Sequence, residues 1–306
     1  MKSSESSIRY GGIMAVRMVA KAIKPFRLIS MVCMYVLGGG LVQYVEHMRD
    51  WTVFIGGGIF LLLFAVSMDL LAMLHLLNDQ KKWPDGMTHD KVKTTRLVIA
   101  LTSATFLTVV ITILIGWMAE GFLWQGLNFL LIGAAAIGAL YFLTQILDSL
   151  LIHQMFIEVV LFVAIPPALA YFLQSQEPHR MLTMAVISLA PAYIAYRLLE
   201  QLRSFASDKN LGNRTIVTAV GWEKAMVFHN AFLLLEFFLM ALCAILGFPW
   251  FLIWPVFLTL PLGILEIWLM ERVKQGKKPL WRVMVYASAS VFFIPIYLLG
   301  FAFWIR

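Results

Sequence analysis

Charged residues are scarce in this chain, and their scarcity excludes a soluble globular protein. Only 13% of the 306 residues are Asp, Glu, Lys or Arg, whereas 61% are hydrophobic and the mean hydropathy is +0.84. A water-facing surface needs about twice that share of charged residues. The chain is therefore predicted to lie in a lipid bilayer.

Cysteine is also rare, and its placement excludes a cysteine-based metal site. Cys33 and Cys243 each stand alone in apolar sequence, so both are interpreted as small core residues. A cleaved signal peptide is not expected, because residues 1–7 are largely polar and no cleavage site precedes the first apolar run. No short repeat or low-complexity linker divides the chain. Residues 1–306 are therefore expected to form one transmembrane domain.

Long apolar runs are abundant. Runs of about twenty residues recur along the whole chain, and each is long enough to cross a hydrocarbon core of about 30 Å as a helix. They do not alternate as barrel strands do, and only helices or closed barrels satisfy their backbone groups in lipid. We therefore predict an all-α, polytopic membrane protein. Nine transmembrane helices are expected, at about 28–47, 52–77, 97–118, 122–144, 149–173, 181–202, 225–247, 249–270 and 283–304.

Basic residues are distributed unevenly among the connections. Twenty-one Lys and Arg fall on residues 1–27 and on the second, sixth and eighth connections, and the other side receives only Arg49, Arg180 and Arg306. Because Lys and Arg mark the cytoplasmic side, the N-terminus is predicted to be cytoplasmic, in the cell (cytoplasmic) membrane. This topology accounts for the excess of 24 Lys and Arg over 17 Asp and Glu, so no nucleic-acid partner is expected. Residues 1–27 mix basic and apolar side chains and are predicted to form an amphipathic segment on the membrane surface.

Two polar connections on the predicted cytoplasmic face carry the candidate chemistry. The stretch from His75 to Gly86 reads HLLNDQKKWPDG, and the stretch from Ser204 to Thr215 reads SFASDKNLGNRT. Lys24-Pro25 precedes the first span, and Glu158 lies in the fifth span ahead of Phe162 and Pro166.

In order and spacing, these motifs resemble those of UbiA-type intramembrane prenyltransferases over about residues 20–245. That family carries Asn-Asp-x-x-Asp in one loop and Asp-x-x-x-Asp followed by Gly-x-Arg-Thr in another, and its menaquinone-type members have a Glu-containing fifth helix. The resemblance implies helices around a central cavity. It also implies Mg²⁺-assisted transfer of a polyprenyl group from its diphosphate to an aromatic, quinone-precursor-like acceptor, with carboxylates of both loops holding the metal.

The resemblance assigns roles to ten residues. Asp79 and Asp208 would be catalytic and would hold Mg²⁺ together with Asn78. His75 and Glu158 would face the acceptor or the cavity, and membrane lipids would surround the bundle. Contacts to the diphosphate would come from Lys82, Arg96, Arg203, Lys209 and Arg214.

Two positions depart from the family pattern. Lys82 stands at the second Asp of the first motif, and Ser204 stands at the first Asp of the second motif. Glu200 is one candidate substitute for a missing carboxylate, beside Asp85 and Asp90. The departures leave two alternatives open, a terpene cyclase of the same fold and a non-catalytic lipid-binding pseudoenzyme. A transporter is disfavoured, because the charges gather at one rim instead of forming a path through the midplane.

Overall fold

Long helices make up nearly all of the chain that the structure describes. The structure is a computed structural model, and it describes residues 25–77, 89–119, 125–146, 151–212 and 214–305. In chain order the helices are α2 (Pro25–Val45), α3 (Trp51–Leu76), α4 (His89–Ala119), α5 (Gln125–Ile146), α6 (Leu151–Val159), η3 (Val160–Ala164), α7 (Ile165–Phe172), α8 (Arg180–Leu211), α9 (Ile216–Val220), α10 (Trp222–Ile245), α11 (Trp250–Ile253), η4 (Trp254–Thr259), α12 (Leu260–Lys274) and α13 (Trp281–Ile305).

These helices confirm the predicted fold class. Within the described ranges, eight helical stretches are long and apolar enough to cross a membrane, and α5 adds a shorter apolar section, Leu130–Tyr141. Each of the nine predicted spans therefore corresponds to a helical stretch. The protein is an all-α, polytopic membrane protein.

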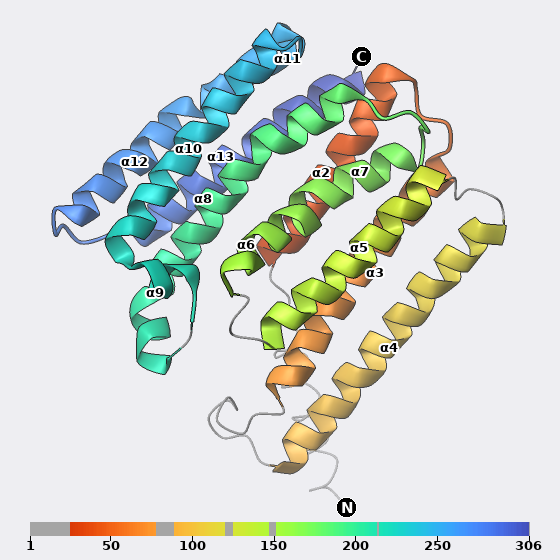
Figure 1. Ribbon diagram of the computed structural model, residues 1–306, viewed down its shortest axis with the longest axis horizontal. Coiled ribbons are helices and arrows are strands. Elements are labelled where there is room, and N and C mark those ends of the chain that lie inside the picture. The colour runs from red at the N-terminus through yellow and green to blue at the C-terminus, as the bar shows by residue number, and fades with distance from the viewer. Residues whose placement is uncertain (1–24, 78–88, 120–124, 147–150, 213, 306) are drawn as a thin grey trace, which may run out of the picture.

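The direction of the helices brings the basic connections to one end of the bundle. Figure 1 shows α2, α3 and α4 running alternately up and down, and α8, α10, α12 and α13 doing the same in the second half of the chain. The ends of α3, α8 and α12 therefore lie at the same end as the starts of α4, α10 and α13 (Figure 1). This is the arrangement that the uneven distribution of Lys and Arg requires.

Small residues on α2 allow close helix packing in the centre of the bundle. Gly38 lies against α7 so closely that a Cβ there would stand 2.3 Å from the carbonyl oxygen of Pro167. On another face of α2, the indole of Trp304 on α13 donates a hydrogen bond to the carbonyl oxygen of Val36 at 3.0 Å. Helices in lipid associate mainly through such close packing, because lipid tails are as apolar as the side chains.

The fifth predicted span is interrupted where two prolines follow one another. Pro166 and Pro167 stand in the first turn of α7 and lack the N–H groups that would continue the hydrogen bonds of α6. The backbone accommodates them with a short π-helical stretch, η3. Glu158 lies just before this irregularity, near the end of α6.

Two boundaries differ from those expected. Helix α8 continues to Leu211 instead of ending near residue 202, because residues 203–211 contain no Gly or Pro. Gly212 then ends the helix in the left-handed conformation (φ 69°). Helix α2 already begins at Pro25, so the last residues of the predicted surface segment 1–27 belong to the first spanning helix. Residues 1–24 lie outside the described ranges.

Candidate functional site

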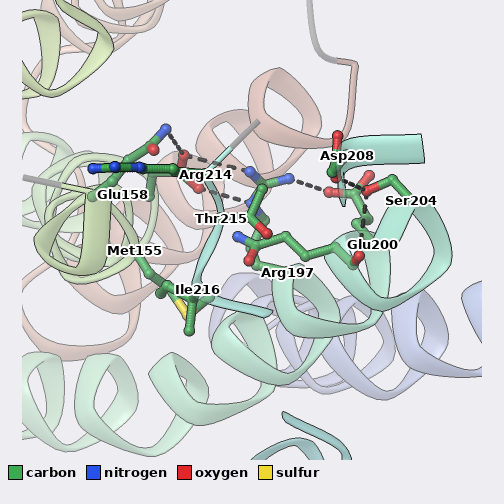
Figure 2. A pocket seen from close by; sticks show the side chains of 11 residues that line it. Met155, Glu158, Arg197, Glu200, Ser204, Asp208, Arg214, Thr215 and Ile216 are labelled. Carbon is green, nitrogen blue, oxygen red and sulfur yellow. Dashed lines mark hydrogen bonds and ion pairs between the residues drawn. The ribbon is translucent and has the colours of Figure 1, made fainter. Parts of the chain in front are cut away.

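A polar pocket of about 360 Å³ lies where α6, the C-terminal part of α8 and the start of α9 meet. Figure 1 shows α6, the end of α8 and the start of α9 at the end of the bundle that carries the basic connections. Figure 2 shows the side chains of the pocket from close by. The residues that line this polar pocket are Gln154, Met155, Glu158, Arg197, Glu200, Gln201, Ser204, Asp208, Arg214, Thr215 and Ile216.

One face of α8 supplies most of the polar atoms of the pocket. Arg197, Glu200, Ser204 and Asp208 are three or four residues apart, so their side chains project from the same face of the helix. The Ser204 hydroxyl donates a hydrogen bond to Oδ2 of Asp208 at 2.5 Å. Because α8 runs on to Leu211, Asp208 is held on a rigid helix instead of a loop.

The deep side of the pocket is an arginine–glutamate network made of Arg27, Glu158, Arg197 and Glu200. Glu158 accepts hydrogen bonds from Nη2 of Arg27 and from Nε of Arg197, the latter at 2.8 Å. Arg197 also forms an ion pair with Glu200, and dashed lines in Figure 2 mark both of its partners. The side chains of Arg27 and Glu158 are each 2% exposed. Ion pairs withdrawn from water to this degree are held in place by their mutual attraction, since neither charge can be left alone in a low dielectric.

Arg27 links the network to the interior of the bundle. Its Nη1 donates a hydrogen bond to the hydroxyl of Tyr141 on α5 and lies 3.9 Å from Oδ1 of Asp69 on α3. Its guanidinium carbon is 5.5 Å from the ring centres of both Tyr141 and Phe162, within the range of a cation–π contact. Polar groups therefore extend from the pocket rim into the centre of the bundle.

Aromatic rings border the same network. Phe26 stacks on Tyr196 with ring centres 3.4 Å apart, and the Tyr196 hydroxyl donates to Oε1 of Glu200 at 3.2 Å. Tyr193, Phe292 and Phe293 pack around Phe26 at ring-centre distances of 5.1 to 5.8 Å. The electron-rich faces of such rings can stabilise a nearby cation.

Two further cavities lie deeper in the bundle, and Asp69 and Tyr141, which contact Arg27, line the smaller one. A cavity of about 20 Å³ is lined by Asp69 and Tyr141 together with apolar side chains. It shares Met31, Phe64 and Leu161 with a second cavity of about 100 Å³, which lies among α2, α3, α4, α5 and the α6–α7 region. The second cavity is lined entirely by apolar side chains. A polar pocket with apolar space beyond it is suited to a ligand with a charged head and an apolar tail.

The acidic side chains that the structure describes suit a metal ion bound jointly with a phosphate ligand better than a metal ion bound by the protein alone. In the parts of the chain that the structure describes, no group of three or more His, Cys, Asp or Glu side chains is placed to hold a metal ion. Glu200 and Asp208 nevertheless present carboxylate oxygens on one face of the pocket. Mg²⁺ commonly uses one or two protein carboxylates and completes its shell with substrate phosphates and water. These residues are compatible with that mode of binding.

Comparison with known proteins identifies the fold. No protein-family model and no curated protein sequence matches the chain. Its structure is similar to that of a UbiA homologue from Archaeoglobus fulgidus bound to DMAPP and Mg²⁺, with a TM-score of 0.58 and 14% sequence identity over 95% of this chain and 98% of the other. The chain has the UbiA fold. A structure from a study of digeranylgeranylglyceryl phosphate synthase is also similar, with a TM-score of 0.51 and 12% identity over 91% of this chain and 96% of the other.

The UbiA fold brings together part of the predicted site. Asp208, Arg214 and Glu158 all line the polar pocket although they come from different elements. Arg203 and Lys209 lie on α8 and are exposed, outside the pocket lining. Asn78, Asp79 and Lys82 lie outside the described residues. His75 belongs to the last turn of α3, and the structure describes its backbone alone.

Arg96 lies on α4 and connects the two helices that flank the first motif. Its Nη2 donates a hydrogen bond to the carbonyl oxygen of Leu77, beyond the last residue of α3. It does not line the polar pocket. In the described structure Arg96 therefore fixes the end of α3 relative to α4, directly beside the stretch that carries Asn78 and Asp79.

Three residues at or beside the arginine–glutamate network are absent from the predicted site: Arg27, Arg197 and Tyr141. On sequence alone, the two arginines are indistinguishable from other cytoplasmic charges, and Tyr141 is one aromatic residue among many. The signal available for Arg27 and Arg197 was the presence of Glu158 in an apolar span, because a buried acid needs a cationic partner. These two partners are 131 and 39 residues from Glu158, and only the tertiary packing determines which cations reach it.

Proposed function

We propose that this protein is a membrane prenyltransferase, which transfers a prenyl group from a prenyl diphosphate to an apolar acceptor at the polar pocket. The observation that carries the proposal is the joint presence of cationic and acidic side chains in the polar pocket, at the end of an apolar bundle with the UbiA fold. Arg197 and Arg214 supply cationic groups, and Asp208 and Glu200 supply carboxylates. The UbiA homologue bound to DMAPP and Mg²⁺ supports a substrate of this chemical class.

The residues of the pocket suggest how the leaving diphosphate is stabilised. Ionisation of an allylic diphosphate requires neutralisation of the charge that develops on the phosphate oxygens. Mg²⁺, when bound, supplies Lewis-acid stabilisation of that charge, and Asp208 and Glu200 would hold it together with Asp79 of the first motif. Arg214 is exposed at the pocket rim, so it is available to bind phosphate there.

The proposed transfer also needs an acceptor and protection of an allylic cation from water. The buried rings of Tyr193 and Phe162 and the partly buried ring of Phe26 lie beside the arginine–glutamate network and shield it from water. An aromatic, quinone-precursor-like acceptor is compatible with these surroundings because aromatic rings stack on one another. We propose an acceptor of this class, as in menaquinone-type relatives, with Glu158 and His75 near it. The positive-inside asymmetry supports a cytoplasmic position for the pocket.

A second candidate function is binding of a lipid phosphate without turnover. The pairing of Glu158 and Glu200 with arginines favours it, because paired carboxylates are less available to a metal. In this case Arg214 would still attract an anionic head group, and the apolar cavities would still receive a tail.

Release of diphosphate separates the two candidates. Purified protein in lipid nanodiscs is incubated with labelled DMAPP or longer prenyl diphosphates, with Mg²⁺, and with or without an aromatic acceptor. A transferase should release diphosphate and form a prenylated acceptor. A cyclase should release diphosphate even without an acceptor. A lipid-binding protein should release no diphosphate and form no prenylated acceptor. Arg214→Ala should lower release at least tenfold, whereas Arg282→Ala, an exposed arginine at the same end outside the pocket, should not change it. Binding of DMAPP that produces no diphosphate under any of these conditions would refute the enzymatic proposal.

A further inference from the structure

A second group of ionisable side chains is buried between α10 and α12, separate from the polar pocket. His229 and Glu236 lie on α10 and Glu266 lies on α12, and each of the three residues is 0% exposed. None of them lines the polar pocket. Both helical stretches are long and apolar enough to span the membrane. Ionisable groups in such positions are costly to maintain and mark functional positions by default.

The ring of His229 lies between two polar side chains. Nε2 of His229 lies 2.9 Å from Oε1 of Glu266, and Nδ1 lies 3.1 Å from Oδ1 of Asn230. His229 therefore provides Glu266 with a polar partner inside the bundle.

Glu236 has no such partner. Both of its carboxyl oxygens are buried without a hydrogen-bond partner, and so is Oε2 of Glu266. Glu236 is fully buried, and Glu266 on the neighbouring helix is an acid of the same sign. An isolated carboxylate beside a second carboxylate in an apolar interior is strongly unfavourable, and a bound cation removes that cost.

The helices that pack against α10 do not supply this cation within the described residues. On α8, Arg197 and Glu200 line the polar pocket instead, and Arg180, Arg203 and Lys209 are exposed. On α12, Arg272 lies over the ring of Trp268, 4.8 Å from its centre, and Lys274 is exposed. On α13, Arg282 is exposed, and α9 and α11 contain no charged residue.

The packing also limits what can bind. Gly263, one turn before Glu266, meets the ring of Phe237 so closely that a Cβ would stand 2.9 Å from Cε2 of that ring. A metal ion would need several ligands, and within the described ranges no group of three His, Cys, Asp or Glu side chains is placed to hold one. A proton needs only one oxygen atom.

We propose that Glu236, Glu266 and His229 form an intramembrane proton-binding site, in which Glu236 holds an exchangeable proton opposite the His229–Glu266 pair. The site is independent of the polar pocket and of any prenyl transfer there. Proton exchange at this site would make the C-terminal half of the bundle sensitive to pH.

Infrared difference spectroscopy of the full chain in lipid nanodiscs tests the proposal without requiring a reagent to reach the buried site. A protonated carboxyl absorbs at a higher frequency than a carboxylate and shifts in D₂O. At neutral pH, replacement Glu236→Gln should remove one such band, and Glu266→Gln should retain it. Glu271→Gln, an exposed glutamate on α12, is the control and should remove only carboxylate absorption.

The outcomes are distinct. If Glu236→Gln removes carboxylate absorption instead, Glu236 is ionised and the proposal is wrong. If replacing choline chloride with sodium chloride abolishes the protonated band of the wild type, the ligand is a metal cation and the proposal is also wrong. If Glu236→Gln does not fold, Glu266→Gln decides alone, because loss of the band in that variant would place the proton on Glu266.

Discussion

Replacement of Glu158 by glutamine removes the charge that holds the arginine–glutamate network together. The wild-type carboxylate accepts hydrogen bonds from Arg27 and Arg197, and Nε2 of Gln154 donates to it at 3.2 Å. Glutamine is nearly the same size and keeps one oxygen acceptor, so the change leaves no cavity. It leaves the buried guanidinium of Arg27 with Asp69, at 3.9 Å, as its remaining acidic neighbour.

The size of the effect follows from burial. Breaking a buried ion pair by removing one partner costs about 3 to 5 kcal/mol, because the other charge stays desolvated. Glu200 provides a matched control, since it pairs with the same Arg197 but its side chain is 36% exposed. Solvent screens a pair of that exposure, so Glu200→Gln should cost at most about 1 kcal/mol.

Equilibrium unfolding in mixed micelles of mild detergent and sodium dodecyl sulfate measures both free energies. The expected result is a clear difference between the two variants, of about 2 kcal/mol or more. A double variant that also carries Arg27→Gln should lose less than the sum of the single effects, because the charge stranded by Glu158→Gln is gone. Equal costs for Glu158→Gln and Glu200→Gln would refute the role assigned to the buried network.

Three further outcomes are expected. Ser204→Asp places a second carboxylate beside Asp208 and should strengthen Mg²⁺ binding. Titration should show that the Mg²⁺ concentration for half-maximal prenyl diphosphate binding falls about tenfold, which is about 1.4 kcal/mol. An unchanged or higher Mg²⁺ concentration would contradict this prediction. Gly38→Ala should destabilise the protein by about 1 to 3 kcal/mol, because the added Cβ would meet the backbone of Pro167. Gly116→Ala is the control and should leave the stability unchanged, because a Cβ there meets nothing within 4 Å. Unfolding in detergent compares the two variants, and equal stability would contradict the close packing of α2 on α7. Cysteines introduced at Gly276 and at Glu177 should react with an impermeant thiol reagent from opposite sides of the membrane, and reaction from the same side would contradict the topology.

The helices were predictable because their signal is local. Apolar length alone located all nine helical stretches, and the distribution of Lys and Arg predicted which connections share one end. The end of α8 was not predicted, because residues 203–211 are polar and hydropathy does not distinguish a polar helix from a loop. The break in the fifth span could be seen in Pro166 and Pro167, but not the π-helical stretch that accommodates them.

The site was predictable only where a motif was present. The resemblance to the Asp-x-x-x-Asp and Gly-x-Arg-Thr pattern selected Asp208 and Arg214, and both line the polar pocket. Arg27 carries no local signal, since a basic residue near the start of a span usually lies at the membrane surface. Its burial depends on contacts with Glu158 and Tyr141, which are 131 and 114 residues away. Contacts at such separations depend on tertiary packing, which one sequence does not reveal.

A structure of the protein with a non-hydrolysable prenyl thiolodiphosphate and Mn²⁺ in place of Mg²⁺ tests the central claim most directly. The account predicts the diphosphate in the polar pocket, with Arg214 and Asp208 on either side of it and the prenyl chain directed toward the apolar cavities beside Tyr141. The anomalous signal of Mn²⁺ should lie between Asp208 and the phosphate oxygens. Diphosphate bound elsewhere, or Mn²⁺ held away from Asp208, would contradict the account.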